Sequence, residues 1–181
     1  NISHKDYITD SVLSIADKAI EMIREQGVDI SPIEKPVTDP LAAELAGREL
    51  IRNEIDGVII FLGSWVECPV VMAAIREIEH LPLCLWGFPM FKENGVTIST
   101  GSYVSYAMFK GTLDRVNFKY RYKPILGVPI DNRIKQSIKS FCQAATAAMK
   151  LKRMRIGLVG YTSMGIYPGT FDHVLLRVII G

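Results

Sequence analysis

Residues 56–69, DGVIIFLGSWVECP, decide the fold class of this 181-residue chain. Asp56 and Gly57 lead into an uninterrupted apolar run at 58–62. Such a run, bounded by turn residues, is typical of a strand that is buried on both faces of a parallel sheet. Pro69 then favours the first turn of a helix, where its missing N–H costs nothing. The stretch therefore predicts a strand, a loop and a helix, which is the first half of a β–α–β unit.

The same alternation extends in both directions along the chain. Apolar residues at helical spacing predict a helix over about 6–26, ended by Gly27, and a short strand at 28–30. Asp39 and Pro40 are typical of an N-cap and the first residue of a helix that runs to about Asn53. The remaining elements that we expect are a helix from Pro69 to Glu79, a strand at 82–86, a loop to Gly101 and Ser102, a helix to about Val116, a strand within 120–128, a helix from Asp131 to Lys152, a strand at 156–159 and a helix at 171–180.

Strands that alternate with helices predict an α/β fold, with an open parallel sheet and flanking helices of the flavodoxin or Rossmann kind. We expect an amino-terminal α/β domain over residues 1–152 and the beginning of a second α/β domain over 153–181. The series starts with a helix, so a strand before residue 1 is expected. One strand and one helix cannot bury both faces of the strand, so the second domain is expected to be truncated.

The composition is that of an ordinary globular protein, with 49% apolar and 22% charged residues and a formal net charge of +2. The densest basic group, at 150–155, lies at the end of a predicted helix, where cations favour the helix dipole. A nucleic-acid partner is therefore not expected. No apolar stretch approaches the ~18 residues that a membrane span needs. Three widely spaced cysteines, Cys68, Cys84 and Cys142, indicate reduced packing residues in a cytoplasmic protein.

Ligands of open parallel sheets bind beyond the carboxyl ends of the strands, and two loops at such positions carry aromatic residues. Trp65, in the loop 63–69, could stack its ring on the C–H face of a sugar or on a base, or it could cover the end of the sheet as a packing residue. Glu67 could carry a proton, although a carboxylate before Pro69 also suits a helix start. Trp86, which follows an apolar strand, is expected to be buried.

A third loop, GYTSMGIYPGTFDH at 160–173, separates two apolar runs. It carries neither the Gly-Lys-Ser/Thr of a phosphate loop nor a GxGxxG pattern, but Ser163 could donate a hydrogen bond to a polyol. Asp172 and His173 are adjacent, so on a helix their side chains diverge and cannot jointly chelate a metal. The residues by themselves predict a binding surface for a sugar or a nucleotide without an evident catalytic set. A non-catalytic binding module of the flavodoxin kind and an oligomerisation scaffold stay open as alternatives.

The third loop and its flanks resemble the L-fucose isomerase and L-arabinose isomerase superfamily. The resemblance lies in GLVGYTSMGI at 157–166, followed by Phe171-Asp172-His173. Three further motifs occur in the same order as in that family: GSWVECP with Trp65, LWGF at 85–88 and GSY at 101–103. The resemblance extends over essentially the whole chain.

This resemblance implies aldose–ketose isomerisation. A divalent metal, usually Mn²⁺, acts there as a Lewis acid on two sugar oxygens, and carboxylates move a proton between two carbons through an enediol. The family's metal ligands, a Glu, an Asp and a His, belong to positions beyond the end of this sequence. No catalytic residue and no metal ligand is therefore assigned here, and we expect this chain alone to be inactive and to bind no metal.

The resemblance also assigns substrate contacts. Trp65 is expected to face an aldose or ketose, in the active site of a neighbouring subunit of a homo-oligomer that is a hexamer by analogy. Met164 is expected to line the pocket from the second domain, with Ser163 beside it, and Thr100 and Gly101 are further candidates. The family's substrate-binding arginine near the amino terminus has no counterpart, so the identity of the sugar stays open.

Overall fold

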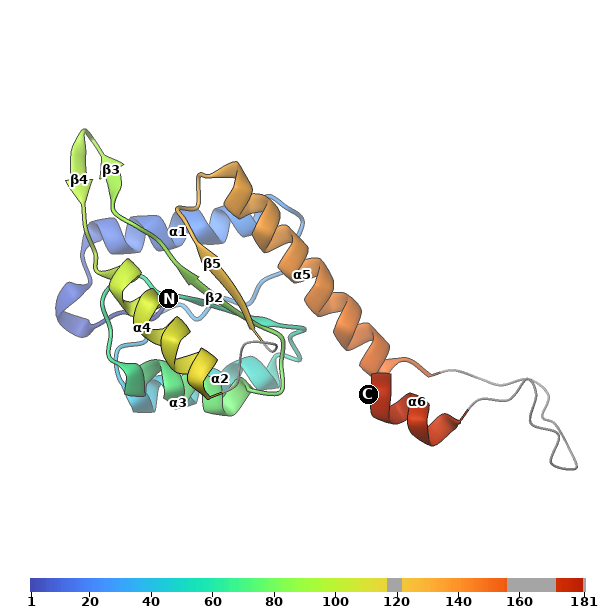
Figure 1. Cartoon of the computed structure of the whole chain (residues 1–181). Coiled ribbons are helices and arrows are strands. Elements are labelled where there is room, and N and C mark those ends of the chain that lie inside the picture. The colour runs from blue at the N-terminus through green and yellow to red at the C-terminus, as the bar shows by residue number, and fades with distance from the viewer. Residues whose placement is uncertain (117–121, 156–171, 181) are drawn as a thin grey trace, which may run out of the picture.

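The predicted strand at 58–62 forms the edge of a three-stranded parallel sheet with the order β1-β2-β5 (Figure 1). The computed structural model describes residues 1–116, 122–155 and 172–180. The elements are η1 (Lys5–Tyr7), α1 (Asp10–Arg24), α2 (Pro40–Arg52), β1 (Val58–Phe61), α3 (Cys68–Ile78), β2 (Leu83–Gly87), β3 (Phe91–Glu93), β4 (Val96–Ile98), α4 (Ser102–Arg115), β5 (Tyr122–Leu126), α5 (Asn132–Arg153) and α6 (His173–Ile180).

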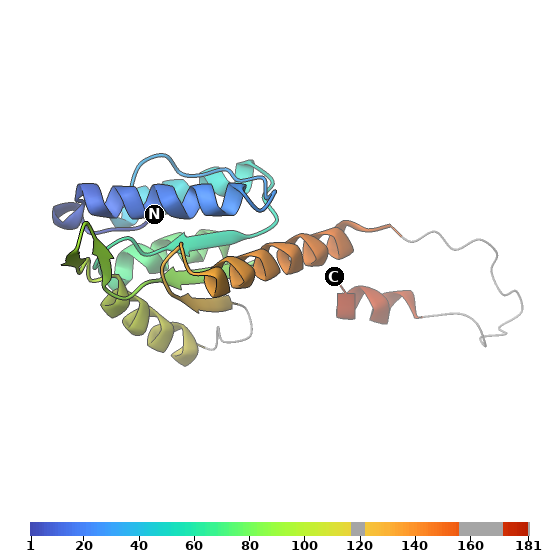
Figure 2. The ribbon, with the colours of Figure 1, turned by 90° about the horizontal axis from the view of Figure 1, so that it is seen from above.

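Helices cover both faces of the sheet, as the apolar strands require. Figures 1 and 2 show α1 and α5 on one side of the sheet and α3 and α4 on the other, with α2 beside α3. Successive side chains of β2 alternate between the two sides: Leu85 packs towards α3 and α4, whereas Trp86 packs towards α1 and α5. The α/β fold with a parallel sheet and flanking helices is therefore present.

Local capping chemistry sets where the helices begin. The side chains of Thr9, Asp39 and Asp131 accept hydrogen bonds from backbone N–H groups in the first turns of α1, α2 and α5. The helix expected over 6–26 accordingly begins at Asp10, and Lys5–Tyr7 forms a separate 3₁₀ turn. Gly27, with φ +72°, ends this helical region as expected.

Two local predictions differ from the structure. Residues 28–30 form no strand, and Val28 and Ile30 instead pack their side chains against the core between α1 and α5. The loop expected between β2 and α4 contains an antiparallel hairpin, β3 and β4. Its turn is Asn94-Gly95, with φ +52° and +81°, the left-handed pair that a tight hairpin turn needs.

The predicted start of a second domain is described only in part. The strand expected at 156–159 lies outside the described residues, whereas α6 lies within the helix expected at 171–180. The division into two domains stays a prediction. Within the described ranges, the helices are all too short or too polar to cross a membrane.

Candidate functional site

The site expected around Trp65 lies at the carboxyl end of β1, where the backbone of this residue is fixed from two sides. The N–H of Trp65 donates to the carbonyl oxygen of Thr100 (2.8 Å), and its own carbonyl oxygen accepts from the N–H of His4 (3.0 Å). Ser64 strengthens the link, because its Oγ accepts from the same His4 N–H (3.2 Å) and donates to the Trp65 carbonyl (3.1 Å). The amino-terminal segment and the start of α4 thus hold the loop after β1 between them.

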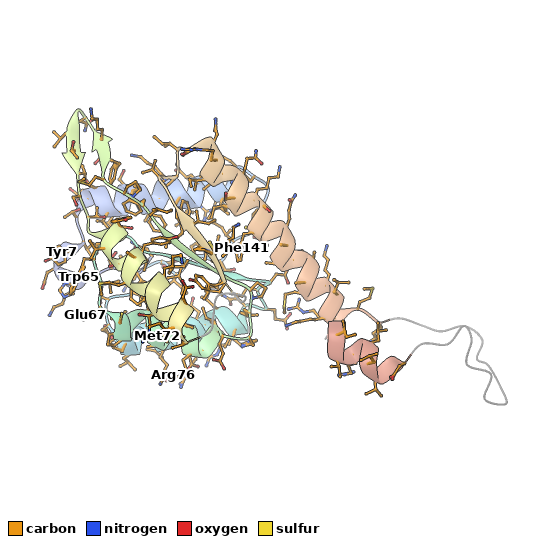
Figure 3. The ribbon with its side chains drawn as sticks, viewed as in Figure 1. Tyr7, Trp65, Glu67, Met72, Arg76 and Phe141 are labelled. Atoms are coloured by element: carbon orange, nitrogen blue, oxygen red, sulfur yellow. The ribbon has the colours of Figure 1, made fainter. Side chains whose placement is uncertain are left out.

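The indole of Trp65 belongs to an aromatic cluster with His4 and Tyr7. The His4 ring lies 5.3 Å from it, tilted by 53°, and the Tyr7 ring lies 6.1 Å away, edge to face. Trp65 is half-buried and Tyr7 is 51% exposed. Figure 3 shows Tyr7, Trp65 and Glu67 along one edge of the molecule. The cluster therefore gives a partly exposed aromatic surface beyond the end of the sheet.

Thr100 and Gly101, both predicted substrate contacts, support Trp65 from behind. Gly101 has φ +81°, and a Cβ on it would lie 2.7 Å from the Cβ of Trp65. Glycine is thus needed here both for its left-handed backbone and for the close approach. Thr100 Oγ1 accepts from the N–H of Ser102 (3.3 Å) at the start of α4. The contacts of these two residues are those of positioning residues, and a contact with substrate stays a prediction for them.

Two serines of α4 that the sequence does not mark as site residues connect the loops after β1 and β2. Ser105 Oγ accepts from the N–H of Val66 (2.9 Å), and Ser102 Oγ accepts from the N–H of Phe88 (3.0 Å). Both serines are buried, so their hydroxyls satisfy loop N–H groups that water cannot reach. Their i, i+3 spacing, which places them on one side of the helix, was the available signal.

Glu67 is the N-cap residue of α3 but makes no side-chain capping hydrogen bond. Its side chain is exposed, at the same edge of the molecule as Trp65 (Figure 3). A carboxylate at this place is stabilised by the positive end of the helix dipole. Glu67 therefore adds negative charge beside the aromatic cluster.

The remaining predicted contacts, Ser163 and Met164, lie outside the described residues. Asp172 is described, and its Oδ1 accepts from the N–H groups of Val174 and Leu175, both at 2.9 Å. These bonds satisfy donors of the first turn of α6, so Asp172 caps this helix.

Within the described part of the chain, side chains that could hold a metal are not gathered at this site. Across residues 1–116, 122–155 and 172–180, no three His, Cys, Asp or Glu side chains lie close enough to hold a metal ion. A metal of the kind that the resemblance implies would take its ligands from other residues. Burial raises the pKa of the thiols of Cys84 and Cys142, which keeps them protonated and unreactive, in line with packing roles.

A groove of about 820 Å³ lies elsewhere, between α1, α5 and the outer edge of β1, and neither Trp65, Thr100 nor Gly101 lines it. The candidate site is thus an aromatic surface beyond the sheet and is separate from this groove. No protein-family model matches the chain, and no curated protein matches it.

Proposed function

We propose that this chain provides a sugar-stacking surface for a metal-dependent aldose–ketose isomerase of the L-fucose or L-arabinose isomerase kind. The observation that carries the proposal is the half-buried indole of Trp65 beyond the carboxyl end of a parallel strand. Open α/β sheets bind their ligands at that end. The face of an indole matches the C–H face of a pyranose or an open-chain sugar.

The rigidity of Trp65 favours binding. Its peptide group is hydrogen-bonded on both sides, and Gly101 and the rings of His4 and Tyr7 restrict its side chain. A ring that is already ordered loses little conformational entropy when a sugar stacks on it. A polar group that suits sugar hydroxyls lies beside the indole. His4 Nδ1 accepts a hydrogen bond from the Asp6 N–H, so a neutral His4 imidazole would carry its proton on Nε2, where it is a hydrogen-bond donor.

The described residues bind and position in this proposal and do not perform the proton transfer. Isomerisation between C1 and C2 needs a base to remove one proton and a Lewis acid or a proton donor to stabilise the developing oxyanion. Among the residues that the structure describes, no metal-holding group is assembled around Trp65. The chemistry then belongs to residues beyond those described, and the sugar would lie between the two parts, in a homo-oligomer.

The two tryptophans of the chain provide a direct test in ¹⁵N-labelled protein. We expect L-fucose or L-arabinose to shift the indole N–H signal of Trp65, with an affinity on the order of millimolar. The signal of Trp86 serves as the internal control, because this indole is fully buried and donates to the Gly127 carbonyl (2.8 Å). The variant Trp65→Phe identifies the signal.

The outcomes separate the possible functions. A shift with AMP but not with sugars would favour the nucleotide-binding module, and no shift with either ligand would remove Trp65 from any binding site of this chain. With Mn²⁺ and either aldose, we expect the chain to give no ketose. Measurable turnover would show that the catalytic groups lie within these residues.

A further inference from the structure

Another pocket, of about 400 Å³, lies at the end of the sheet opposite to Trp65. Its lining comes from three places: the end of α2 with the residues that follow it, the turn after α3, and the last turns of α5. Ile55 and Leu81, which line it, lie just before β1 and β2. Because these strands are parallel, the pocket lies at their amino ends. Its volume is in the range of small-molecule sites.

The floor of this pocket is apolar and belongs to the hydrophobic core. Leu81 is buried, and Ile55 and Met149 are partly buried and pack against the core cluster between the sheet, α3 and α4. Ile51, 40% exposed, continues the apolar surface towards solvent. An apolar group that lies on this floor would displace water from it, which favours binding.

Three ionisable side chains from the three segments complete the lining: Glu54, His80 and Arg153. Arg153 contacts Asp56, with Nη1 3.5 Å from Oδ1, and the other N–H groups of its guanidinium are left for a second acceptor. In the ranges that the structure describes, neither the Glu54 carboxylate nor the His80 imidazole has a hydrogen-bond or ion-pair partner. The pocket thus combines an apolar floor with one negative group and two groups that donate to anions.

The backbone of Glu54 is held in a conformation that glutamate disfavours. Its φ is +51°, and in the described ranges the other non-glycine residue with positive φ is Asn94, in the hairpin turn. Glu54 follows Asn53, the C-cap of α2, at the position where helices commonly place glycine. The turn explains the left-handed backbone but not the choice of glutamate. Residues strained in this way are frequent at ligand sites, which indicates a use for the carboxylate.

We propose that this pocket binds an apolar α-amino acid such as L-leucine. The aliphatic side chain would lie on the floor, the ammonium group would pair with Glu54, and the carboxylate would accept hydrogen bonds from Arg153 and His80. A wholly apolar molecule would leave the charged groups unused, and a simple anion would be repelled by Glu54. A sugar would cover the apolar floor with hydroxyl groups. An apolar amino acid uses all three parts of the lining.

Titration of the ¹⁵N-labelled chain with L-leucine tests the proposal. We expect the backbone amide signals of Ile55 and Leu81 to shift, with an affinity on the order of millimolar, and the indole signal of Trp65 to stay unchanged. Three analogues each lack one part of the ligand: 4-methylpentanoate the amine, leucinamide the carboxylate and glycine the side chain. Each should bind at least about tenfold more weakly. If 4-methylpentanoate bound as well as L-leucine, or if L-leucine shifted neither amide, the proposal would be overturned.

Two charge-removing variants with matched controls test the partners of the ligand. Glu54→Gln and Arg153→Gln should each weaken binding of L-leucine at least about tenfold. Glu49→Gln and Arg133→Gln change exposed residues of the same two helical regions outside the pocket, and they should leave the affinity within about twofold. Arg133 is a close match for Arg153, since it also pairs with an aspartate on the protein surface. Unchanged affinity in both pocket variants would contradict the proposal.

Glu54→Gly separates a role in binding from a role in the turn. Glycine relieves the strain of the positive φ, so the midpoint of thermal unfolding should rise by about 2 °C, whereas binding of L-leucine should weaken at least about tenfold. Full affinity in the glycine variant would show that the carboxylate contributes nothing to binding. A lower midpoint would show that Glu54 stabilises the helix end, and a strained carboxylate kept for a ligand would then be disproved.

Discussion

Trp65 and Trp86 lie at the carboxyl ends of neighbouring parallel strands, yet their surroundings differ. Trp86 pairs in register with Phe61, is fully buried, and donates its indole N–H to the Gly127 carbonyl. Trp65 comes four residues after Phe61, is half-buried, and has rings rather than a hydrogen-bonded core around its indole. The difference shows that the tryptophan within the strand packs in the core, whereas the tryptophan just beyond the strand forms part of the molecular surface.

The backbone hydrogen bonds of the two tryptophans differ in the same way as their side-chain surroundings. Trp86 is part of the β1-β2-β5 ladder, so its position depends on the whole sheet. Trp65 depends on two short segments, one at His4 and one at Thr100. Changes at Trp86 should therefore affect global stability, and changes near Trp65 should mainly affect the local surface.

The largest expected effect is that of Trp86→Ala. Removal of a fully buried indole leaves a cavity and an unpaired Gly127 carbonyl, which should lower the free energy of unfolding by about 3–5 kcal/mol. Urea denaturation measures the change. Trp86→Phe, which keeps an aromatic ring, should cost less. An alanine variant as stable as the parent would contradict the assignment of Trp86 to the core.

In a polypeptide that has its free amino end at Asn1, burial of this amine should make stability depend on pH. Burial lowers the pKa of this amine from the usual 8.0 to about 6, so between these values the unfolded chain binds more protons than the folded one. The free energy of unfolding should thus rise as the pH increases from about 6 to 8, by at most about 2.7 kcal/mol. Comparison with the amino-terminally acetylated chain isolates this contribution. Identical pH profiles for the two forms would show that the amine is solvated in the folded state.

Gly101→Ala should disturb the support of Trp65 without touching its ring. The left-handed backbone and the overlap with the Trp65 Cβ should lower the free energy of unfolding by about 2 kcal/mol and shift the indole signal of Trp65. Gly111→Ala is the matched control, because Gly111 lies in the interior of α4 with open space around it and alanine there should stabilise by about 0.5–1 kcal/mol. If both substitutions changed stability in the same direction, the special role of Gly101 would be disproved.

The smallest effect on stability is expected for Trp65→Ala. Because the ring is partly exposed and packs beside the rings of His4 and Tyr7, its loss should cost only about 1 kcal/mol, while sugar-induced shifts in neighbouring signals should disappear. Chemical denaturation and the sugar titration measure the two quantities on the same variant. A loss of stability as large as that of Trp86→Ala would remove the contrast between the two tryptophans.

The sequence predicted most of the elements because they depend on short-range chemistry. Asp39 and Asp131 cap α2 and α5 where expected, since a carboxylate accepts from the first-turn N–H groups whatever surrounds the helix. The hairpin of β3 and β4 was missed although Asn94-Gly95 is a strong turn signal. The strand expected at 28–30 is absent because these residues pair with no strand of the described chain, although Val28 and Ile30 pack their side chains into the core beside α1 and α5.

At the candidate site, the loop that carries Trp65 could be predicted from the sequence, but the residues that hold this loop in place could not. Trp65 could be chosen because it follows a strand directly. Ser102 and Ser105 were missed, because their i, i+3 spacing places them on one side of the helix but does not tell whether that side is buried. Only the fold brings their hydroxyls to the N–H groups of Phe88 and Val66.

The sequence by itself determined the apolar strands, the helix caps and therefore the α/β class, because each follows from neighbouring residues alone. The burial of Trp86 was also expected from the sequence. Only the tertiary structure decided that Trp65 is partly exposed, which serines are buried, and where the groove lies. Those properties depend on contacts between residues far apart in the chain, such as His4 with Trp65 and Thr100 with Trp65. Local propensity carries no information about such pairs, because burial and pairing arise only when the segments pack together.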